Sequence, residues 1–234
     1  MPGYQPEESV RLPLVRQRWD SIAFINWRYP RPLLSALVPA HLEVEEIDGS
    51  AWVTMTPFVA RATRLAGLGR VPDFPETNLR TYVRTRSGRG AVWFLSIEAA
   101  SPVMVAGARA LLGVPYRWAV MSARTGGERC EYHSRRRADG RHHHVEIWPG
   151  PRLDPARVAV RDHLLTGRWL AVPPRAGARL AVPVHHQPWD LHAAEVGRLE
   201  EDLTAAAGLP APEESPNALW SPGVDAVLGA PRRG

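Results

Sequence analysis

The sequence predicts an α+β protein that is mainly antiparallel β, built as a barrel or sandwich with three to four helices packed on its periphery. Three observations favour this class. Apolar segments of strand length recur along the chain with turn residues between them, several at hairpin spacing. Helical signals are confined to three or four segments. Strands and helices do not alternate regularly, as they would around a parallel sheet.

The length and composition fit one domain. At 234 residues, with 44% of them hydrophobic, the chain is long enough to bury one large core. We place this domain at residues 15–231 and treat residues 1–14 as an N-terminal lead-in. Cys130 is the single cysteine, so no intrachain disulfide can form. Because no apolar run has the length of a signal peptide or a membrane span, we expect a cytoplasmic protein with no membrane partner.

Strand and hairpin signals dominate the N-terminal part of the chain. An apolar strand with aromatic residues is predicted over residues 18–27, followed by a short helix over residues 32–39. Asp48 and Gly49 occupy the turn of a predicted tight hairpin between HLEVEEI and AWVTMTPFVARA. A second hairpin is predicted where residues 76–99 carry two strand patterns around the turn sequence SGRG.

Capping residues predict a helix in the middle of the chain. Ser101 is a suitable N-cap, Pro102 suits the first turn, and the helical pattern runs to Leu112 with Gly113 after its end. Beyond this helix, three strand-like segments joined by RTGGE and ADG predict a three-stranded meander over residues 116–148.

The segment after the meander combines a helix with two strands. Asp154 and Pro155 are predicted to start a helix, which Gly167 ends. Strands are predicted over residues 168–172 and 179–186.

A last helix is predicted with Asp190 as its N-cap and with Gly208 and Pro210 as its stop. Its apolar positions repeat at helical spacing, at Val196, Leu199, Leu203 and Ala206. A final strand is predicted over residues 218–228.

The strand predicted at ETNLRTYV carries the most informative pattern for function. Because side chains alternate between the two faces of a strand, one face carries a row of hydrogen-bonding groups, namely Glu76, Asn78, Arg80 and Tyr82. Two interpretations stay open. The row is the solvent side of a two-faced sheet, or it lines a polar barrel interior in which the carboxylate and the guanidinium hold an anionic or carbonyl ligand.

Motifs for other chemistries are absent or weak. Histidines at 142–144 and in VHHQPWDLH have no HExxH or CxxC pattern beside them, so we predict no metal site. The chain contains no GxSxG elbow, P-loop or GxGxxG fingerprint, and no cofactor is predicted. Basic turns such as the one with Arg84, Arg86 and Arg89 offer contacts to nucleic acid, but we favour the interpretation that they are solvated hairpin ends.

The chain contains no lysine, since all 29 of its basic residues are arginine. An arginine side chain stays charged and cannot form a Schiff base with a carbonyl substrate. Reactions that require a side-chain amine, including imine-dependent decarboxylation, are therefore excluded.

Several blocks of the sequence resemble a known family. In chain order they are QRW, AWVTMTPF, FPETNLRTYV, VWFLSIEA, ARALLGVPY, YHSRRR, VHHQPWDLHAAE and SPGVD. Together they resemble the YqjF-like family of uncharacterised proteins (domain of unknown function 2071), from about Val15 to about Pro231. That family is similar to the acetoacetate decarboxylase-like superfamily, so the resemblance implies a closed, mostly antiparallel barrel around a small-molecule cavity.

The same resemblance implies roles for individual residues. Acetoacetate decarboxylases carry a GRExxGxPKK block, whose first lysine forms a Schiff base and whose second lysine lowers the pKa of the first. The block GARALLGVPYRW is similar, with Arg109 in step, Tyr116 at the Schiff-base position and Arg117 at the tuning position. FPE resembles a YxE block that places a carboxylate near the reacting centre, which implies that role for Glu76.

These observations predict a small-molecule ligand, expected to be a carboxylate or keto acid, bound in a barrel cavity without Schiff-base chemistry. The predicted ligand-binding residues are Asn78, Arg80, Tyr82, Arg109 and Arg117. The alternative is a non-decarboxylating enzyme, such as a lyase, hydratase or cyclase, in which Glu76 and Tyr116 transfer protons as catalytic residues. Nucleic-acid binding through the basic turns is a third hypothesis, which we do not favour.

Overall fold

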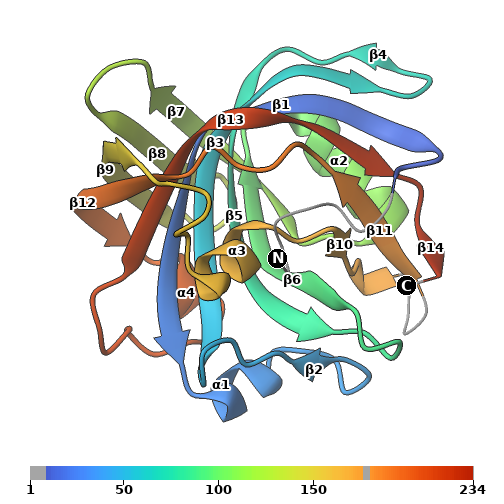
Figure 1. The fold of residues 1–234 in the computed structure, drawn as a ribbon. Helices are drawn as coiled ribbons and strands as arrows, with labels where there is room; N and C mark the ends of the chain where they lie inside the picture. The colour runs from blue at the N-terminus through green and yellow to red at the C-terminus, as the bar shows by residue number, and fades with distance from the viewer. Residues whose placement is uncertain (1–8, 176–179, 234) are drawn as a thin grey trace.

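The computed structural model describes residues 9–175 and 180–233, and these form fourteen strands and four helices (Figure 1). The strands are β1 (Pro13–Tyr29), β2 (Glu43–Val44), β3 (Ala51–Leu65), β4 (Gly69–Arg70), β5 (Phe74–Arg84), β6 (Gly90–Ala99), β7 (Tyr116–Arg124), β8 (Cys130–Arg136), β9 (His142–Arg152), β10 (Leu170–Ala171), β11 (Leu180–His185), β12 (His192–Glu201), β13 (Asn217–Gly229) and β14 (Arg232–Arg233). The helices are α1 (Arg31–Ser35), α2 (Pro102–Leu112), α3 (Val160–Thr166) and α4 (Leu203–Ala206). In the part of the chain that the structure describes, no helix is long and apolar enough to cross a membrane.

Two predicted segments fall partly outside the described residues. Most of the lead-in predicted at residues 1–14 lies there, and β1 already begins at Pro13. Arg179, the first residue of a predicted strand, also lies outside, and β11 is described from Leu180 onward.

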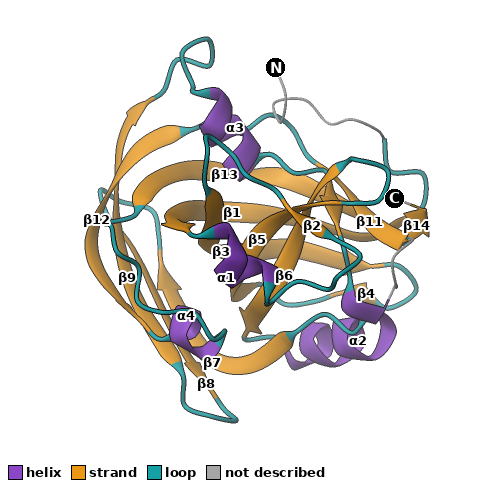
Figure 2. Ribbon diagram, turned by 90° about the horizontal axis from the view of Figure 1, so that it is seen from below, coloured by secondary structure: helices purple, strands orange, loops and turns teal. Residues whose placement is uncertain are grey.

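The sheet closes into two rings that share strands. In the first ring the order is β5-β3-β1-β13-β12-β9-β8-β7-β6, and β6 pairs with β5 to close it. In the second ring β13 pairs with β11, which leads through β10 to β6, β5, β3 and β1. Figure 2 shows β12, β9 and β8 curving around one side of the molecule, with β11 on the other side. Only β6 with β7 and β6 with β10 pair in parallel among the described strands, so the prediction of a mainly antiparallel fold is confirmed.

The strands common to both rings are buried on both faces. On one face of β5, Leu79 packs with Tyr132 and Ile147 in the core of the first ring. On the other face, Tyr82 belongs to a separate apolar cluster on the side of the second ring. Because each ring covers one face of β5, the polar row of this strand lies in the interior of the protein. The solvent-side interpretation of that row is therefore wrong.

Several local predictions are confirmed. The Met104 N–H donates to Ser101 Oγ over 3.4 Å at the start of α2, and Gly113 ends the helix with a left-handed φ of 68°. Glycine suits this position because a side chain disfavours that conformation. The hairpin of β5 with β6 and the meander of β7, β8 and β9 form as predicted.

The turn at Asp48 and Gly49 is present, but the hairpin around it is not. Both residues have positive φ, 54° and 71°, as a tight turn of this kind requires. Only Ile47 and Ser50 bridge across the turn. The strand predicted before it is reduced to β2, which pairs with β5 and leaves β3 to pair with β1 and β5.

The helix predicted after Asp190 is wrong in its larger part. The segment forms β12, which pairs with β9 and β13, and only the four residues of α4 are helical. A β-bulge at Gly197 explains the misleading pattern, because it adds one residue to β12 between two successive pairs with β9. The bulge places Val196 and Leu199 on the same face three residues apart, a spacing that imitates one turn of helix.

The helix predicted from Asp154 begins later, at Val160. Asp154 and Pro155 form a turn instead, in which the Asp154 carboxylate accepts a hydrogen bond from the Ala156 N–H over 3.0 Å. Aspartate caps turns and helices with the same side-chain chemistry, so residue type alone does not separate the two. The predicted end of the helix at Gly167 is confirmed.

Candidate functional site

A cavity of about 150 Å³ lies inside the second ring. The strands of that ring supply most of its wall, and α2 and the first residue of β7 supply the rest of one side. A cavity of this order holds a ligand roughly the size of benzene. Most of the wall is apolar, and the polar side chains that interrupt it are those of Gln17, Trp19, Thr56, Glu76, Asn78, Arg80, Tyr116, Thr166, Arg168 and His186.

Glu76 and Tyr116 meet at the wall of this cavity. Glu76 lies on β5 and Tyr116 begins β7, and both strands pair with β6, which brings the two side chains together. The Tyr116 hydroxyl donates a hydrogen bond to Glu76 Oε2 over 3.1 Å. Only 4% of Glu76 and 9% of Tyr116 are exposed to solvent. The two residues predicted to be catalytic therefore share one buried environment.

Burial controls the protonation of this pair. It raises the pKa of Glu76 to about 8, because the carboxylate loses its hydration, while donation from Tyr116 lowers that pKa and the charge of Glu98 raises it. Burial also holds the pKa of the Tyr116 phenol well above its usual range. At neutral pH Glu76 is thus mostly a neutral acid, which is the state that a proton donor needs.

Arg80 brings a positive charge to the same cavity. The residue is only 9% exposed, and its guanidinium lies 5.9 Å from the ring centres of Phe24 and Tyr82. Its Nη2 donates to the Leu165 carbonyl over 3.0 Å, whereas its Nε has no hydrogen-bond partner among the described residues. No carboxylate of those residues lies within 4.0 Å of the guanidinium, so Glu76 and Arg80 do not neutralise each other directly.

The other buried arginines near this region are paired. Arg168, which also lines the cavity, contacts Glu45 over 2.9 Å. Arg136 contacts Glu98 over 2.5 Å and holds it with a second, 2.7 Å hydrogen bond from Nε. A buried charge is costly unless it is paired, so the unpaired guanidinium of Arg80 is exceptional among these three.

Further polar atoms of the cavity wall lack partners within the described part of the chain. They are Trp19 Nε1, Thr56 Oγ1, Asn78 Oδ1 and Arg168 Nη2. Buried polar atoms in folded proteins nearly always form hydrogen bonds. Together with Arg80 Nε, these atoms form a mixed set of donors and acceptors that is available to a bound molecule.

Three of the predicted ligand-binding residues do not reach the cavity. Tyr82 is fully buried behind it, and its hydroxyl donates to the Leu165 carbonyl over 2.5 Å. Arg109 is exposed on the outer side of α2. Arg117 is exposed because it follows Tyr116 in a strand and therefore points to the opposite face. Asn78 and Arg80 are the predicted ligand-binding residues that line the cavity.

His186 is a cavity residue that the sequence interpretation did not assign to the site. Its ring lies 4.5 Å from the rings of Trp169 and Trp189 and 5.6 Å from that of Trp19. Burial lowers the pKa of His186 to about 4, so the imidazole is neutral at physiological pH. The sequence did contain a signal for His186. Because successive side chains of a strand point to opposite faces, one of the adjacent residues His185 and His186 had to point inward.

The run of histidines at 142–144 divides between the two faces of β9. His143 points inward, contacts Thr77 Oγ1 over 2.9 Å and has its pKa lowered to about 3 by burial. His142 and His144 point outward. One group of potential metal ligands is found among the described residues, on this outer face and not in the cavity, and it consists of Glu131, His133 and His144.

The basic turn between β5 and β6 is tied to the protein itself. Arg84 contacts Glu45 over 2.8 Å and donates to the Gly88 carbonyl over 3.1 Å. Nucleic-acid binding by this turn stays the third hypothesis, which we do not favour.

Comparisons with known proteins agree with this architecture. Residues 16–225 match the family of domain of unknown function 2071, whose description is an uncharacterised conserved protein. The chain is 33% identical over 207 residues to the uncharacterised protein YqjF of Bacillus subtilis (strain 168), across 87% of this chain and 85% of that protein.

Solved structures share the fold at low sequence identity. Acetoacetate decarboxylase from Legionella pneumophila has a TM-score of 0.71 and 14% identity, over 100% of this chain and 92% of its own. The enduracididine biosynthesis enzyme MppR, complexed with pyruvate, has a TM-score of 0.62 and 15% identity, over 97% of this chain and 93% of its own. The chain therefore belongs to the YqjF-like family of domain of unknown function 2071, with the fold of acetoacetate decarboxylase.

Proposed function

We propose that the protein binds a small organic carboxylate or keto acid in the cavity of the second ring, with the ligand carboxylate on the guanidinium of Arg80. One observation carries this proposal: Arg80 is buried in the cavity wall and has no carboxylate partner among the described residues. A ligand carboxylate compensates this charge and accepts from the unpaired Nε.

The charge balance of the cavity supports an anionic ligand. Glu76 is mostly neutral at pH 7, since burial raises its pKa to about 8. Arg168 is paired with Glu45, a carboxylate that Arg84 also contacts, so Arg80 is the arginine of the described wall that has no carboxylate partner. An anion held there is desolvated at little cost because the cavity already presents hydrogen-bonding groups.

The position of Glu76 supports a keto acid in particular. Glu76 lies four residues before Arg80 on the same face of β5, about 13 Å along the strand. Arg80, Glu76 and Tyr116 all line the same cavity, so a ligand bound there shares it with the protons of Glu76 and Tyr116, which suit a carbonyl oxygen. The enzyme MppR, which shares this fold, has been crystallised in complex with pyruvate, a keto acid.

A thermal-shift screen tests binding. We would use pyruvate, 2-oxobutyrate and phenylpyruvate, each beside its uncharged amide. At 100 times its Kd, a ligand raises the free energy of unfolding by about 2.7 kcal/mol, which for a chain of this size raises Tm by roughly 5 to 10 °C. We expect a shift with an acid, no shift with its amide, and no shift of the Arg80→Met variant.

The exposed Arg109 offers a matched control, because Arg109→Met removes an arginine that does not line the cavity. This variant should keep the full ligand-induced shift. A wild-type protein that no acid stabilises, or an Arg80→Met variant stabilised as strongly as the wild type, would refute the anchoring role.

Proton transfer by Glu76 and Tyr116 is the second candidate function, and their 3.1 Å hydrogen bond with a raised Glu76 pKa favours it. Since the chain has no lysine, the reaction would proceed through an enol and not an imine. The ionised fraction of Glu76 would take the methyl proton, and the Tyr116 hydroxyl would donate to the carbonyl oxygen. The direct test is exchange of the methyl protons of pyruvate for deuterium in D₂O, followed by proton NMR.

If the protein is such an enzyme, exchange should be accelerated by the wild type and slowed at least 100-fold in Glu76→Gln, which retains the shape but not the proton. Tyr116→Phe should slow it less. Binding without accelerated exchange would leave the protein a binder of the acid and remove this second function.

A further inference from the structure

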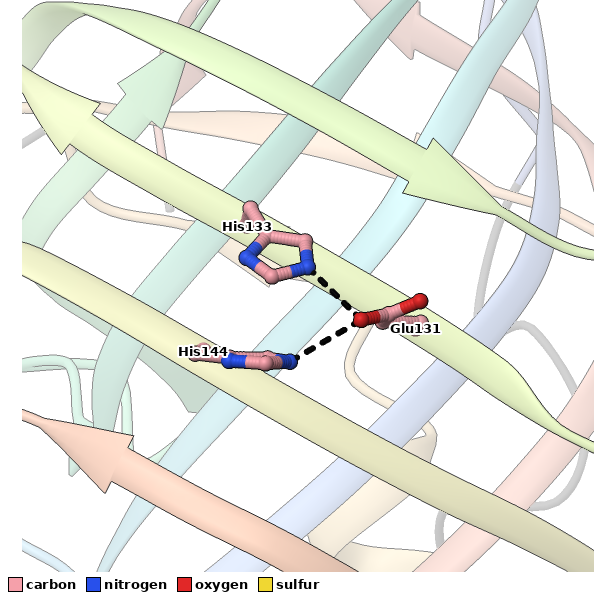
Figure 3. A group of neighbouring side chains, drawn as sticks. All are labelled: Glu131, His133 and His144. Carbon is pink, nitrogen blue, oxygen red and sulfur yellow. Dashed lines mark hydrogen bonds and ion pairs between the residues drawn. The ribbon is translucent and has the colours of Figure 1, made fainter.

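A second cluster of reactive side chains lies far from the cavity, on the outer face of the first ring. Figure 3 shows Glu131 and His133 on β8 and His144 on β9, with both imidazoles directed at the Glu131 carboxylate. His133 Nε2 lies 2.9 Å and His144 Nε2 lies 3.1 Å from the same oxygen, Glu131 Oε1. All three potential ligand atoms lie within 4.8 Å of one another.

We propose that Glu131, His133 and His144 form a binding site for a divalent transition-metal ion such as Zn²⁺. Two imidazoles and one carboxylate are a donor set that such ions prefer. Around a tetrahedral zinc ion with bonds of about 2.0 to 2.1 Å, neighbouring ligand atoms lie about 3.3 Å apart. The two nitrogen–oxygen distances therefore need to open by only a few tenths of an ångström.

The backbone holds these ligands in place. His133 and His144 are directly opposite each other in the antiparallel ladder of β8 and β9, and their ring centres lie 3.8 Å apart. Glu131 lies two residues before His133 and so shares its face. Ligands on paired strands need no chain movement to meet a metal ion, which makes the site preorganised.

The surrounding charges also favour a cation at this point. Glu131 and Glu146 are directly opposite on the same face, an arrangement that destabilises a sheet unless positive charge lies between the carboxylates. Arg124 contacts Glu131 over 3.7 Å, and Arg129 contacts Glu146 over 3.5 Å. The side chain of Arg124 is 86% exposed and reaches Oε2 of Glu131, so Oε1 of Glu131 is left to the two histidines. Glu146 Oε1, the oxygen that Arg129 contacts, also lies 3.7 Å from His144 Nε2 and can supply a fourth ligand if Arg129, whose side chain is 45% exposed, turns away.

The site is accessible on one side. The side chains of Glu131 and His144 are 12% and 15% exposed, whereas that of His133 is 42% exposed. A metal ion can therefore enter past His133 and keep a water molecule in an open position. This outer-face site is independent of the ligand proposed for the cavity.

Zinc titration of the protein without a histidine tag tests the proposal. The wild type should bind one equivalent of Zn²⁺ with a Kd below about 10 µM, measured by competition with a chromogenic chelator. His133→Gln and His144→Gln should each weaken binding at least tenfold, because each removes one of three ligands.

His142→Gln is the matched control. His142 lies on the same outer face, contacts the Asp202 carboxylate over 3.1 Å and has a side-chain exposure of 43%, close to that of His133. This variant should bind zinc as the wild type does. If the wild type shows no saturable binding, or His142→Gln weakens it as much as His133→Gln, the proposal is wrong.

X-ray absorption of the zinc-loaded wild type gives a readout that needs no variant. We expect two imidazole nitrogens and at least one oxygen at about 2.0 to 2.1 Å. A spectrum with fewer than two imidazole ligands would overturn the assignment even if a substituted protein failed to fold.

Discussion

The raised pKa of Glu76 makes the stability of this protein depend on pH in a direction that can be derived. In the unfolded chain the carboxyl has a pKa of 4.5, and in the folded protein burial raises it to about 8. Between these values the unfolded state has released the proton that the folded state keeps. Folding therefore takes up a proton, and the free energy of unfolding falls as pH rises.

The magnitude follows from the same two values. One proton corresponds to about 1.4 kcal/mol per pH unit, so the Glu76 contribution is full below pH 4.5 and declines by at most about 5 kcal/mol by pH 8. Glu76→Gln removes this dependence, because glutamine imitates the neutral acid and its amide oxygen can still accept from Tyr116. We expect the wild type and the variant to be similarly stable near pH 5 and the wild type to be the less stable protein at pH 8.

Urea unfolding followed by tryptophan fluorescence, at intervals from pH 5 to pH 8, measures both profiles. Subtracting them cancels the titration of all groups that the two proteins share. Tyr116→Phe adds a second check, since the phenol lowers the pKa of Glu76 by donating to it and its loss should extend the decline to higher pH. A difference between wild type and Glu76→Gln that stays constant over this range would refute the reasoning.

Two further predictions concern the stability of variants, one at buried arginines and one at glycines. Arg80→Met should leave Tm unchanged or raise it, because it removes a buried charge that has no carboxylate partner among the described residues. Arg136→Met should cost about 3 to 5 kcal/mol, because it leaves the buried Glu98 without its arginine. Thermal unfolding that reverses this order of the two variants would contradict the account. Gly223→Ala should prevent folding or lower Tm sharply, since a Cβ there would lie 2.1 Å from a backbone oxygen of β1 at a φ of 123°. At Gly107 in α2, apart from the helix's own backbone and the adjacent residues, no atom of the described residues lies within 4 Å of an added Cβ. Gly107→Ala should therefore raise the free energy of unfolding by up to about 1 kcal/mol. Equal Tm values for the two glycine variants would oppose this account.

Local chemistry explains which elements were predictable. The limits of α2 follow from Ser101, Pro102 and Gly113, whose capping roles depend on neighbouring backbone groups alone. The bulge at Gly197 defeated the prediction of β12, because a bulge exists only when a second strand is present to define the register.

The candidate site was predictable only in part. Alternation along β5 placed Glu76, Asn78 and Arg80 on one face, and the resemblance to the decarboxylase block pointed to Tyr116. The same resemblance also pointed to Arg117, which the structure places on the exposed side of β7.

By itself, then, the sequence determined the mainly antiparallel class, the polar face of β5 and the exclusion of lysine chemistry, since each depends on residue type or on short-range spacing. Only the tertiary structure decided that this face is interior, that no carboxylate of the described residues lies beside Arg80, and that His133 and His144 meet over Glu131. Those facts depend on ring closure and on the register between strands. Pairings between distant segments set both, and no local pattern encodes them.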